Sequence, residues 1–349
     1  MITMLNKVID ELLEKACPAI RYRVRREILH QPPEMPQLQA LQDLILADPA
    51  VRQTLAAQGP DGWIGRDFHG ADSMEGGIRL LCEKGMEPSQ PPLARALQAL
   101  THPGERLGKG LAKAGPSLDA QGLDGPELIR AVVFAYAGIE DRPDLQAKIR
   151  HALQAFQTVR DMGSPDEPFE PYRGKRVLRQ GFIWPGVYHL RLLAFTQGWR
   201  SAANMKMAAE AVQRLVDYSP LPVYYLRWGS QLIAPGLFCM DDFNPSLLEL
   251  DDNGWMFWFH RAELLARLGV VPAVPALQRQ VHKLAEMMND NDGWFTLRLE
   301  SPYFRKIGPY AGLMLEQDWR VPRRRIYDLT FRSLLILHYS GYLDLQCGA

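Results

Sequence analysis

Residues 252–294 read DNGWMFWFHRAELLARLGVVPAVPALQRQVHKLAEMMNDNDGW and contain the clearest repeating unit of the chain. An apolar helix-like segment is followed by a Leu-Gly-Val-Val-Pro turn, a second helix-like segment and a polar loop that ends in Gly-Trp. Gly-Trp loops occur three times, ending at Trp63, Trp255 and Trp294. Glycine permits a tight turn and tryptophan anchors it, so the recurrence indicates stacked copies of one supersecondary unit. We therefore expect helix pairs around a central cavity.

The bulk composition excludes several classes of protein. Forty basic residues balance forty acidic ones, so no overall field attracts nucleic acid. No stretch approaches the roughly 18 apolar residues of a membrane span, and the amphipathic N-terminal segment differs from a signal peptide. The cysteines at positions 17, 82, 239 and 347 lie far apart, as is typical of reduced thiols. We expect a cytoplasmic protein with no transmembrane segment and no nucleic-acid partner.

Helical periodicity dominates the chain, and no convincing alternating strand is found. Proline and glycine separate the periodic segments. The expected helices are 3–15, 18–30, 37–46, 49–58, 73–85, 92–101, 125–138, 142–160, 183–197, 201–217, 252–269, 273–288 and 326–342.

The periodic segments form pairs whose first helix is more apolar than the second, which favours an inner ring covered by an outer ring. The spacing between the inner helices varies, so the array is not a regular solenoid. Long irregular stretches at 102–124, 161–180, 218–250 and 295–322 are of the length typical of functional loops, and we expect them to cap a cavity mouth. The prediction is one all-α domain over residues 1–349, an (α/α)6 toroid of inner and outer helices.

The segment Glu249-Leu250-Asp251-Asp252-Asn253, the helix pair that follows it and the loop at 289–294 resemble the α/α toroids of the terpene cyclase and prenyltransferase superfamily. Squalene–hopene cyclases carry Asp-x-Asp-Asp-Thr at this place. Here Glu249 stands for the first Asp and Asn253 for the Thr. The segments 18–23 and 55–63 are also similar to members of this repeat group. The resemblance implies an isoprenoid-processing enzyme with an aromatic-lined cavity.

The resemblance also bears on metals. The protein prenyltransferases of this fold hold zinc with Asp, Cys and His. If Asp252 matches their Asp, Gly254 stands at the Cys position and Asp328 at the His position. Two of three ligands are then missing, so we expect no zinc and no other cofactor.

Cyclases of the hopene type begin by protonating an alkene or epoxide. The resemblance makes Asp251 the proton donor, with Glu249 and Asp252 to tune and orient it, because clustered carboxylates in an apolar pocket raise one another's pKa. Asp251, Trp255 and Trp258 share one helical stripe, which puts two indoles beside the acid. Aromatic faces stabilise carbocations. The same chamber is expected to be lined by Trp63, Trp184, Tyr188, Trp228 and Trp294.

Structural roles compete with these assignments. Asp252 and Asn253 have the residue types of helix N-caps, and Trp255 and Trp258 suit a core. His69 and Glu75 flank a helix start and are candidates for the cavity, but capping by Asp72 or Ser73 also explains that segment. Tyr327 and Asp328 begin the last inner helix, where Asp328 is again a plausible cap. The basic run at 320–325 fits either a diphosphate site or a solvated face.

The leading hypothesis is a proton-initiated terpene cyclase or isomerase that takes a hydrophobic isoprenoid ligand. A full cyclase of this kind usually has two toroidal domains, and this chain has room for one. A dimer could supply the second toroid. Peripheral contact with a membrane is also compatible with the sequence. The alternatives are a carbohydrate-active α/α barrel with carboxylates drawn from Asp61, Glu75, Asp251 and Asp292, or a non-catalytic binding or scaffold protein.

Overall fold

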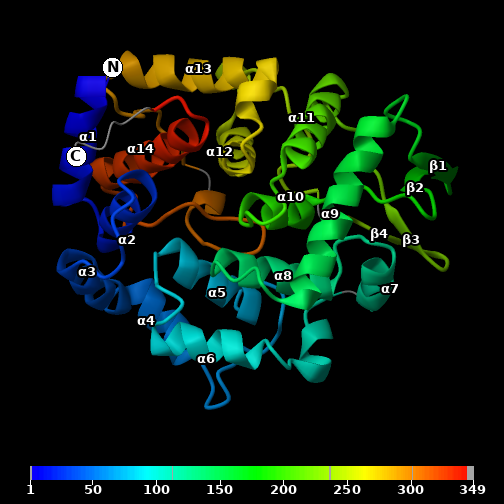
Figure 1. Ribbon diagram of the computed structural model, residues 1–349, viewed down its shortest axis with the longest axis horizontal. Helices are drawn as coiled ribbons and strands as arrows, with labels where there is room; N and C mark the ends of the chain where they lie inside the picture. The colour runs from blue at the N-terminus through cyan, green and yellow to red at the C-terminus, as the bar shows by residue number, and fades with distance from the viewer. Residues whose placement is uncertain (1, 112, 236, 301, 344–349) are drawn as a thin grey trace. The chain divides into compact units, whose positions relative to one another are not determined.

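The computed structural model describes residues 2–111, 113–235, 237–300 and 302–343 (Figure 1). Over these residues the chain is predominantly helical, as the periodicity predicts. None of the described helices combines the length and apolarity needed to cross a membrane. Cys17, Cys82 and Cys239 form no disulfide with one another, and Cys347, also expected to be a reduced thiol, lies outside the described residues.

The described chain contains fourteen α-helices, one π-helical segment and four short 3-10 helices. In chain order these elements are α1 (Ile2–Lys15), α2 (Pro18–Arg23), η1 (Val24–Ile28), α3 (Pro36–Leu46), α4 (Pro49–Ala56), α5 (Met74–Glu83), α6 (Pro91–Ala99), η2 (Gly104–Gly108), α7 (Gly115–Ala120), α8 (Pro126–Tyr136), α9 (Pro143–Asp161), α10 (Val187–Ala194), α11 (Ala202–Asp217), η3 (Leu247–Glu249), α12 (Asp252–Leu268), η4 (Val271–Ala273), α13 (Pro275–Asn289), η5 (Pro302–Phe304) and α14 (Pro322–Tyr339).

Each expected helix is present, and the differences have local causes. Proline stands at the first position of many helices, where its fixed φ and missing N–H are tolerated. Helix α14 therefore begins at Pro322, four residues before the expected start at 326. The short α7 lies in a stretch that was expected to be irregular.

The expectation of no strands is wrong. β1 (Phe169–Tyr172) pairs antiparallel with β2 (Lys175–Leu178), and β3 (Leu226–Trp228) pairs antiparallel with β4 (Gln231–Ile233). Both hairpins lie in stretches expected to be irregular, and their strands of three or four residues are too short to give a clear alternating pattern.

Two of the three Gly-Trp loops have the same backbone. Gly62 and Gly293 adopt φ of 86° and 85°, a left-handed conformation that side chains disfavour. A Cβ at Gly62 would also lie 2.5 Å from the carbonyl oxygen of Arg95. Gly254 is different, because it lies inside α12 rather than in a turn. The copy that ends at Trp255 therefore resembles the other two in sequence but not in structure.

The contacts between residues divide the chain into two compact units. Unit 1 comprises Met1–Arg106, Asp251–Phe259 and Gln280–Ala349, and unit 2 comprises Leu107–Leu250 and His260–Arg279. The expectation of a single domain stays a prediction, because two compact units can belong to one folding domain.

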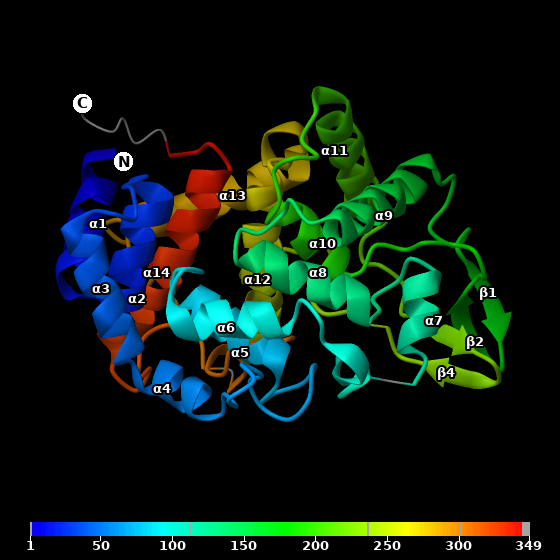
Figure 2. The same cartoon turned by 60° about the horizontal axis from the view of Figure 1, so that its bottom comes forward.

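Unit 1 joins the two ends of the described chain. Helix α14 lies beside α2 in both views (Figures 1 and 2). It also packs against η1. The run from Tyr327 to Leu337 in α14 is buried throughout. The hydroxyl of Tyr339 donates to Glu27 at 3.0 Å. In the same unit α5 buries most of its residues and α6 far fewer, as expected for the first and second helix of a pair.

In unit 2, α9 packs against α8, α10 and α11 (Figure 2). Every residue of α10 is buried, whereas α11 keeps one exposed face, so the same inner and outer distinction holds. The two hairpins lie together because Val177 of β2 and Tyr225, just before β3, form a parallel bridge.

Candidate functional site

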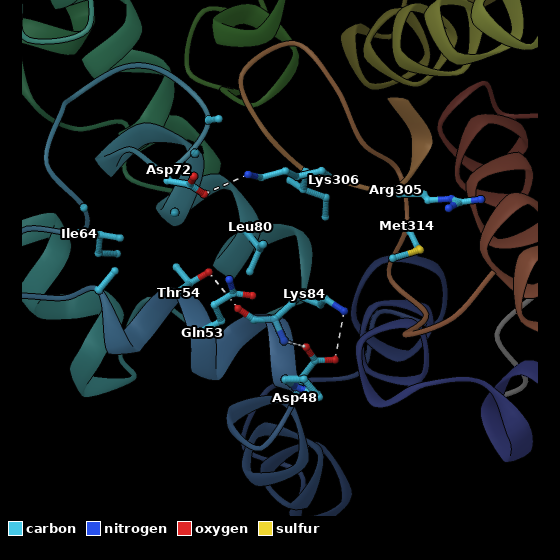
Figure 3. A pocket seen from close by; sticks show the side chains of 18 of the residues that line it. Asp48, Gln53, Thr54, Ile64, Asp72, Leu80, Lys84, Arg305, Lys306 and Met314 are labelled. Carbon is cyan, nitrogen blue, oxygen red and sulfur yellow. Dashed lines mark hydrogen bonds and ion pairs between the residues drawn. The ribbon is translucent and has the colours of Figure 1, made fainter. Parts of the chain in front are cut away.

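A pocket of about 660 Å³ opens in unit 1 (Figure 3). Its walls come from the start of α4, the loop before α5, α5 itself and the irregular segment 305–317. Small and aliphatic groups form much of the lining, and they include Ala50, Ala57, Ile64, Gly77, Leu80, Ile307 and Met314. The polar lining includes Asp48, Gln53, Thr54, Asp72, Lys84, Arg305, Lys306, Glu316 and Gln317.

One end of the pocket is closed by a buried ion pair. The ammonium of Lys84, 3% exposed, lies 3.1 Å from Oδ2 of Asp48 and also donates to the carbonyl oxygen of Leu315. The other oxygen of Asp48 accepts the backbone N–H groups of Ala50 and Val51, so Asp48 is the N-cap of α4. Both groups are thus held by several partners, as buried charges require.

Glu316 is the least compensated carboxyl group of this pocket. It is 5% exposed, and its Oε1 accepts the backbone N–H of Cys17 at 2.7 Å. Two cations act on it: Arg324, whose Nε lies 3.9 Å from Oε2, and Lys84, whose charge also favours the ionised form. Burial and the nearby charge of Asp328 raise the pKa of Glu316 to about 7. This carboxyl group can therefore hold or release a proton near neutral pH.

Asp328 positions the turn that carries Glu316. Its carboxylate accepts the backbone N–H of Leu315 at 2.8 Å, that of Glu316 at 3.0 Å and the indole N–H of Trp319. Burial raises the pKa of Asp328 to about 6, and these hydrogen bonds act in the opposite direction. Asp328 was expected to bind substrate or to cap its own helix. Instead it is fully buried behind the pocket wall, and Tyr327, expected beside it in the site, donates its hydroxyl to Glu11 at 2.9 Å.

The structure brings His69 and Glu75 together at the start of α5. Nδ1 of His69 lies 2.5 Å from Oε2 of Glu75, which is fully buried, and the ring of Tyr310 stands edge-on to the imidazole. Ser73 between them is the N-cap of α5, because its hydroxyl accepts the N–H of Gly76. The expected capping is thus confirmed for Ser73. Residues 71–73 line the pocket, whereas His69 and Glu75 lie outside the residues that line it.

The acidic motif does not have the burial that its assigned chemistry requires. Asp251 is exposed, and its Oδ1 accepts the N–H of Gly254 at 2.7 Å, so the capping role falls on Asp251, one residue earlier than expected. Asp252 is half-buried and accepts the N–H of Glu300 at 2.6 Å. Glu249 is exposed at the end of η3. The three carboxylates are therefore not enclosed together in an apolar chamber.

Trp255 and Trp258 do share a face of α12, as expected. Their rings lie 5.3 Å apart and, with Phe259 and Phe295, they form a buried cluster in unit 1. The indole N–H of Trp258 donates to Gln280 at 2.8 Å. These contacts give both indoles a role in the core.

The other tryptophans expected in unit 1 stand apart from this cluster. The guanidinium of Arg106 lies 5.2 Å from the ring of Trp63, and that of Arg323 lies 4.1 Å from the ring of Trp294. Arg323 also pairs with Glu11, while Arg320 pairs with Asp318. The basic run at 320–325 thus has carboxylate partners at these positions, which favours the reading as a solvated face.

Trp184 and Tyr188 belong to unit 2 and pack in its core. Trp184 contacts Phe169 and Tyr224, and Tyr188 lies under the guanidinium of Arg191 at 5.2 Å. The carboxylates considered for a sugar site are also dispersed. Asp61 pairs with Arg106 on the surface, Asp292 is exposed, and Glu75 is buried against His69.

Sequence reasoning did not select Asp48, Lys84 or Glu316. The one signal that pointed toward Glu316 was the length of the irregular stretch 295–322, which was expected to cap a cavity mouth and supplies residues 305–307, 314, 316 and 317 of the lining.

Scans of protein-family models, of curated proteins and of solved structures found nothing that matches this chain. Among the described residues, no three His, Cys, Asp or Glu side chains gather in an arrangement that could hold a metal ion.

Proposed function

We propose that this protein is a proton-transfer enzyme that binds a small, largely apolar isoprenoid in the pocket of unit 1, with Glu316 as the acid. The observation that carries the proposal is a buried carboxyl group on the wall of a pocket with many aliphatic groups; it accepts one backbone N–H, and burial and Asp328 outweigh the charges of Arg324 and Lys84. The acid is therefore Glu316, rather than the exposed Asp251.

The surroundings of Glu316 suit this role. A proton donor to an alkene must keep its proton near neutral pH, and both desolvation and a neighbouring carboxylate favour the neutral form. Asp328 supplies that neighbouring charge and also holds the backbone of Glu316 in place. The aliphatic walls would keep water away from a cationic intermediate.

The reaction needs no co-reactant. The carboxyl proton of Glu316 forms a new C–H bond with one alkene carbon, and the π electrons of that alkene are used in this bond, which leaves a tertiary carbocation. Loss of a proton from an adjacent carbon to the Glu316 carboxylate forms the new double bond and restores the acid. The net result is isomerisation, or cyclisation where a second alkene attacks the cation first.

The isoprenoid class rests on the sequence resemblance carried by residues 249–253 and the Gly-Trp loops. The alternation of more and less buried helices within each unit supports a closed α/α toroid as part of the proposal. The widely spaced cysteines favour a cytoplasmic protein, and the mismatch at two of the three zinc-ligand positions favours one without a resident cofactor.

The test is incorporation of solvent deuterium. The protein is incubated in heavy water with linear terpenes, squalene and prenyl diphosphates, and products are examined by mass spectrometry and NMR. We expect deuterium at carbon in at least one substrate and a loss of about 10²- to 10⁴-fold in rate for Glu316→Gln, the range typical of a general acid.

Asp251→Asn is the matched control, because it removes the acid implied by the family motif and leaves the pocket intact. The proposal is wrong if Glu316→Gln keeps the wild-type rate or if Asp251→Asn alone abolishes it. Tight binding of one of these compounds with no deuterium in any of them would favour the non-catalytic binding protein.

A further inference from the structure

The two hairpins of unit 2 present their tips side by side. The tip of the first contains Tyr172, Arg173 and Lys175, and the tip of the second contains Arg227 and Trp228. The guanidinium of Arg173 donates to the carbonyl oxygen of Ser230 at 3.2 Å, and that of Arg227 lies 4.5 Å from the ring of Tyr172. The bridge between Val177 and Tyr225 also joins the two hairpins, whose positions are shown in Figure 2. Their tip residues Tyr172, Arg173, Lys175, Arg227 and Trp228 are here called the hairpin surface.

The cations of the hairpin surface lack carboxylate partners among the described residues. Arg173 and Arg227 bond only to carbonyl oxygens and aromatic rings, and the ammonium of Lys175 lies 5.9 Å from the ring of Tyr225. The acidic residues of the same segments are engaged elsewhere or half-buried. Asp166 pairs with Arg176, Glu167 accepts the N–H of Gly163, and Glu170 is half-buried on β1.

One large apolar side chain, that of Trp228, stands exposed next to Arg227, and a second, Val223, is exposed earlier in the same segment. Trp228 at the second tip is 37% exposed, and Val223, shortly before β3, is 69% exposed. An exposed tryptophan next to cations without carboxylate partners is the combination expected at a protein–membrane interface.

We propose that the hairpin surface docks on an anionic lipid bilayer, with Arg173, Lys175 and Arg227 at the headgroups and Trp228 at the interface. Unpaired cations fit the negative surface potential, and tryptophan prefers the depth of the headgroups. Nucleic acid is disfavoured because bases need free aromatic faces to stack. The guanidinium groups of Arg173 and Arg227 lie over Tyr172, and the ammonium of Lys175 lies over Tyr225. This inference does not depend on the chemistry at Glu316.

The test is co-sedimentation of the whole protein with vesicles. One set contains phosphatidylcholine alone, and the other contains phosphatidylcholine with about one quarter phosphatidylserine. We expect binding only to the anionic vesicles, weakened by added salt. Each cation removed should weaken binding about fivefold, so the triple variant Arg173→Gln, Lys175→Gln, Arg227→Gln should lose on the order of 100-fold. Trp228→Ser should weaken binding less.

The control removes the same net charge elsewhere. Arg150, Lys206 and Arg298 are exposed cations outside the two hairpin segments, and their triple Gln variant should bind anionic vesicles like the wild type. The proposal is overturned if the wild type ignores anionic vesicles, if both triple variants lose equally, or if phosphatidylcholine alone suffices. Retention of single-stranded DNA in a gel-shift experiment, with loss in the hairpin variant and no vesicle binding, would assign the surface to nucleic acid instead.

Discussion

At the scale of single residues, the environment of a carboxyl group decides its chemistry more than its place in a motif. Asp251 stands in the segment that resembles a cyclase acid but is exposed and caps a helix. Glu316 stands in no motif but is buried, and the charge of Asp328 acts on it. Desolvation and like charge, which raise a carboxyl pKa, therefore act on Glu316.

This difference predicts how stability depends on pH. Glu316 has an ordinary pKa of 4.5 and a folded-state pKa of about 7. Below pH 4.5 the group is protonated in both states. As pH rises through 7 the unfolded state ionises more readily, so the free energy of unfolding should fall, by at most about 3 kcal/mol.

Urea denaturation at a series of pH values checks this prediction. Glu316→Gln should flatten the curve between about pH 5 and 7, while the exposed control Glu249→Gln should leave it unchanged. Because the pKa of Asp328 is also raised, to about 6, the free energy of unfolding of the Glu316 variant should still fall with pH, but less steeply than that of the wild type. A Glu316→Gln curve parallel to that of the wild type would contradict the assignment.

At the scale of elements, helix starts are set by local chemistry that is readable in the sequence. Ser73 begins α5, and its hydroxyl accepts the N–H of Gly76 at 3.1 Å and donates to the carbonyl oxygen of Gly70 at 2.8 Å. Ser201 begins α11 with a similar bond to Asn204 at an exposed position. Proline at the first helical position marks other starts.

The two serine caps allow a matched comparison. Ser73→Ala should lower the free energy of unfolding by about 1 to 2 kcal/mol, because it leaves the buried N–H of Gly76 and the half-buried carbonyl of Gly70 without their partner. Ser201→Ala should cost less, since water can replace its hydroxyl. Chemical denaturation measures both, and equal losses would show that burial of the Ser73 cap does not matter.

At the scale of the whole molecule, unit 1 is assembled from parts of the chain that are far apart in sequence. Glu83 of α5 lies 2.8 Å from Arg23 of α2 and 2.8 Å from Arg332 of α14. Burial alone would raise the pKa of Glu83, but the two guanidinium groups outweigh it and lower the pKa below its usual range. One carboxylate therefore ties together three helices of the unit.

Removal of that carboxylate should destabilise unit 1 strongly. Glu83→Gln leaves two buried guanidinium groups with less compensation, and the expected loss is about 3 kcal/mol or more. The control is Glu286→Gln, which removes a solvent-exposed partner of Lys283 and should change little. Thermal unfolding followed by circular dichroism measures both, and similar melting temperatures for the two variants would contradict the role of Glu83.

The sequence predicted the approximate positions of the helices other than α7, a cap at Asp72 or Ser73, the turn glycines at 62 and 293, and a shared face for Trp255 and Trp258. Each of these features depends on residues that are close together in the sequence. The residue types and their helical periodicity are therefore enough to predict them. The pocket could not be predicted from the sequence. Asp48, Lys84 and Glu316 meet only because α4, α5 and the segment before α14 pack together. The proton affinity of Glu316 depends on burial and on Asp328, which are properties of that packing, so only the tertiary structure decided which carboxyl group could act as an acid.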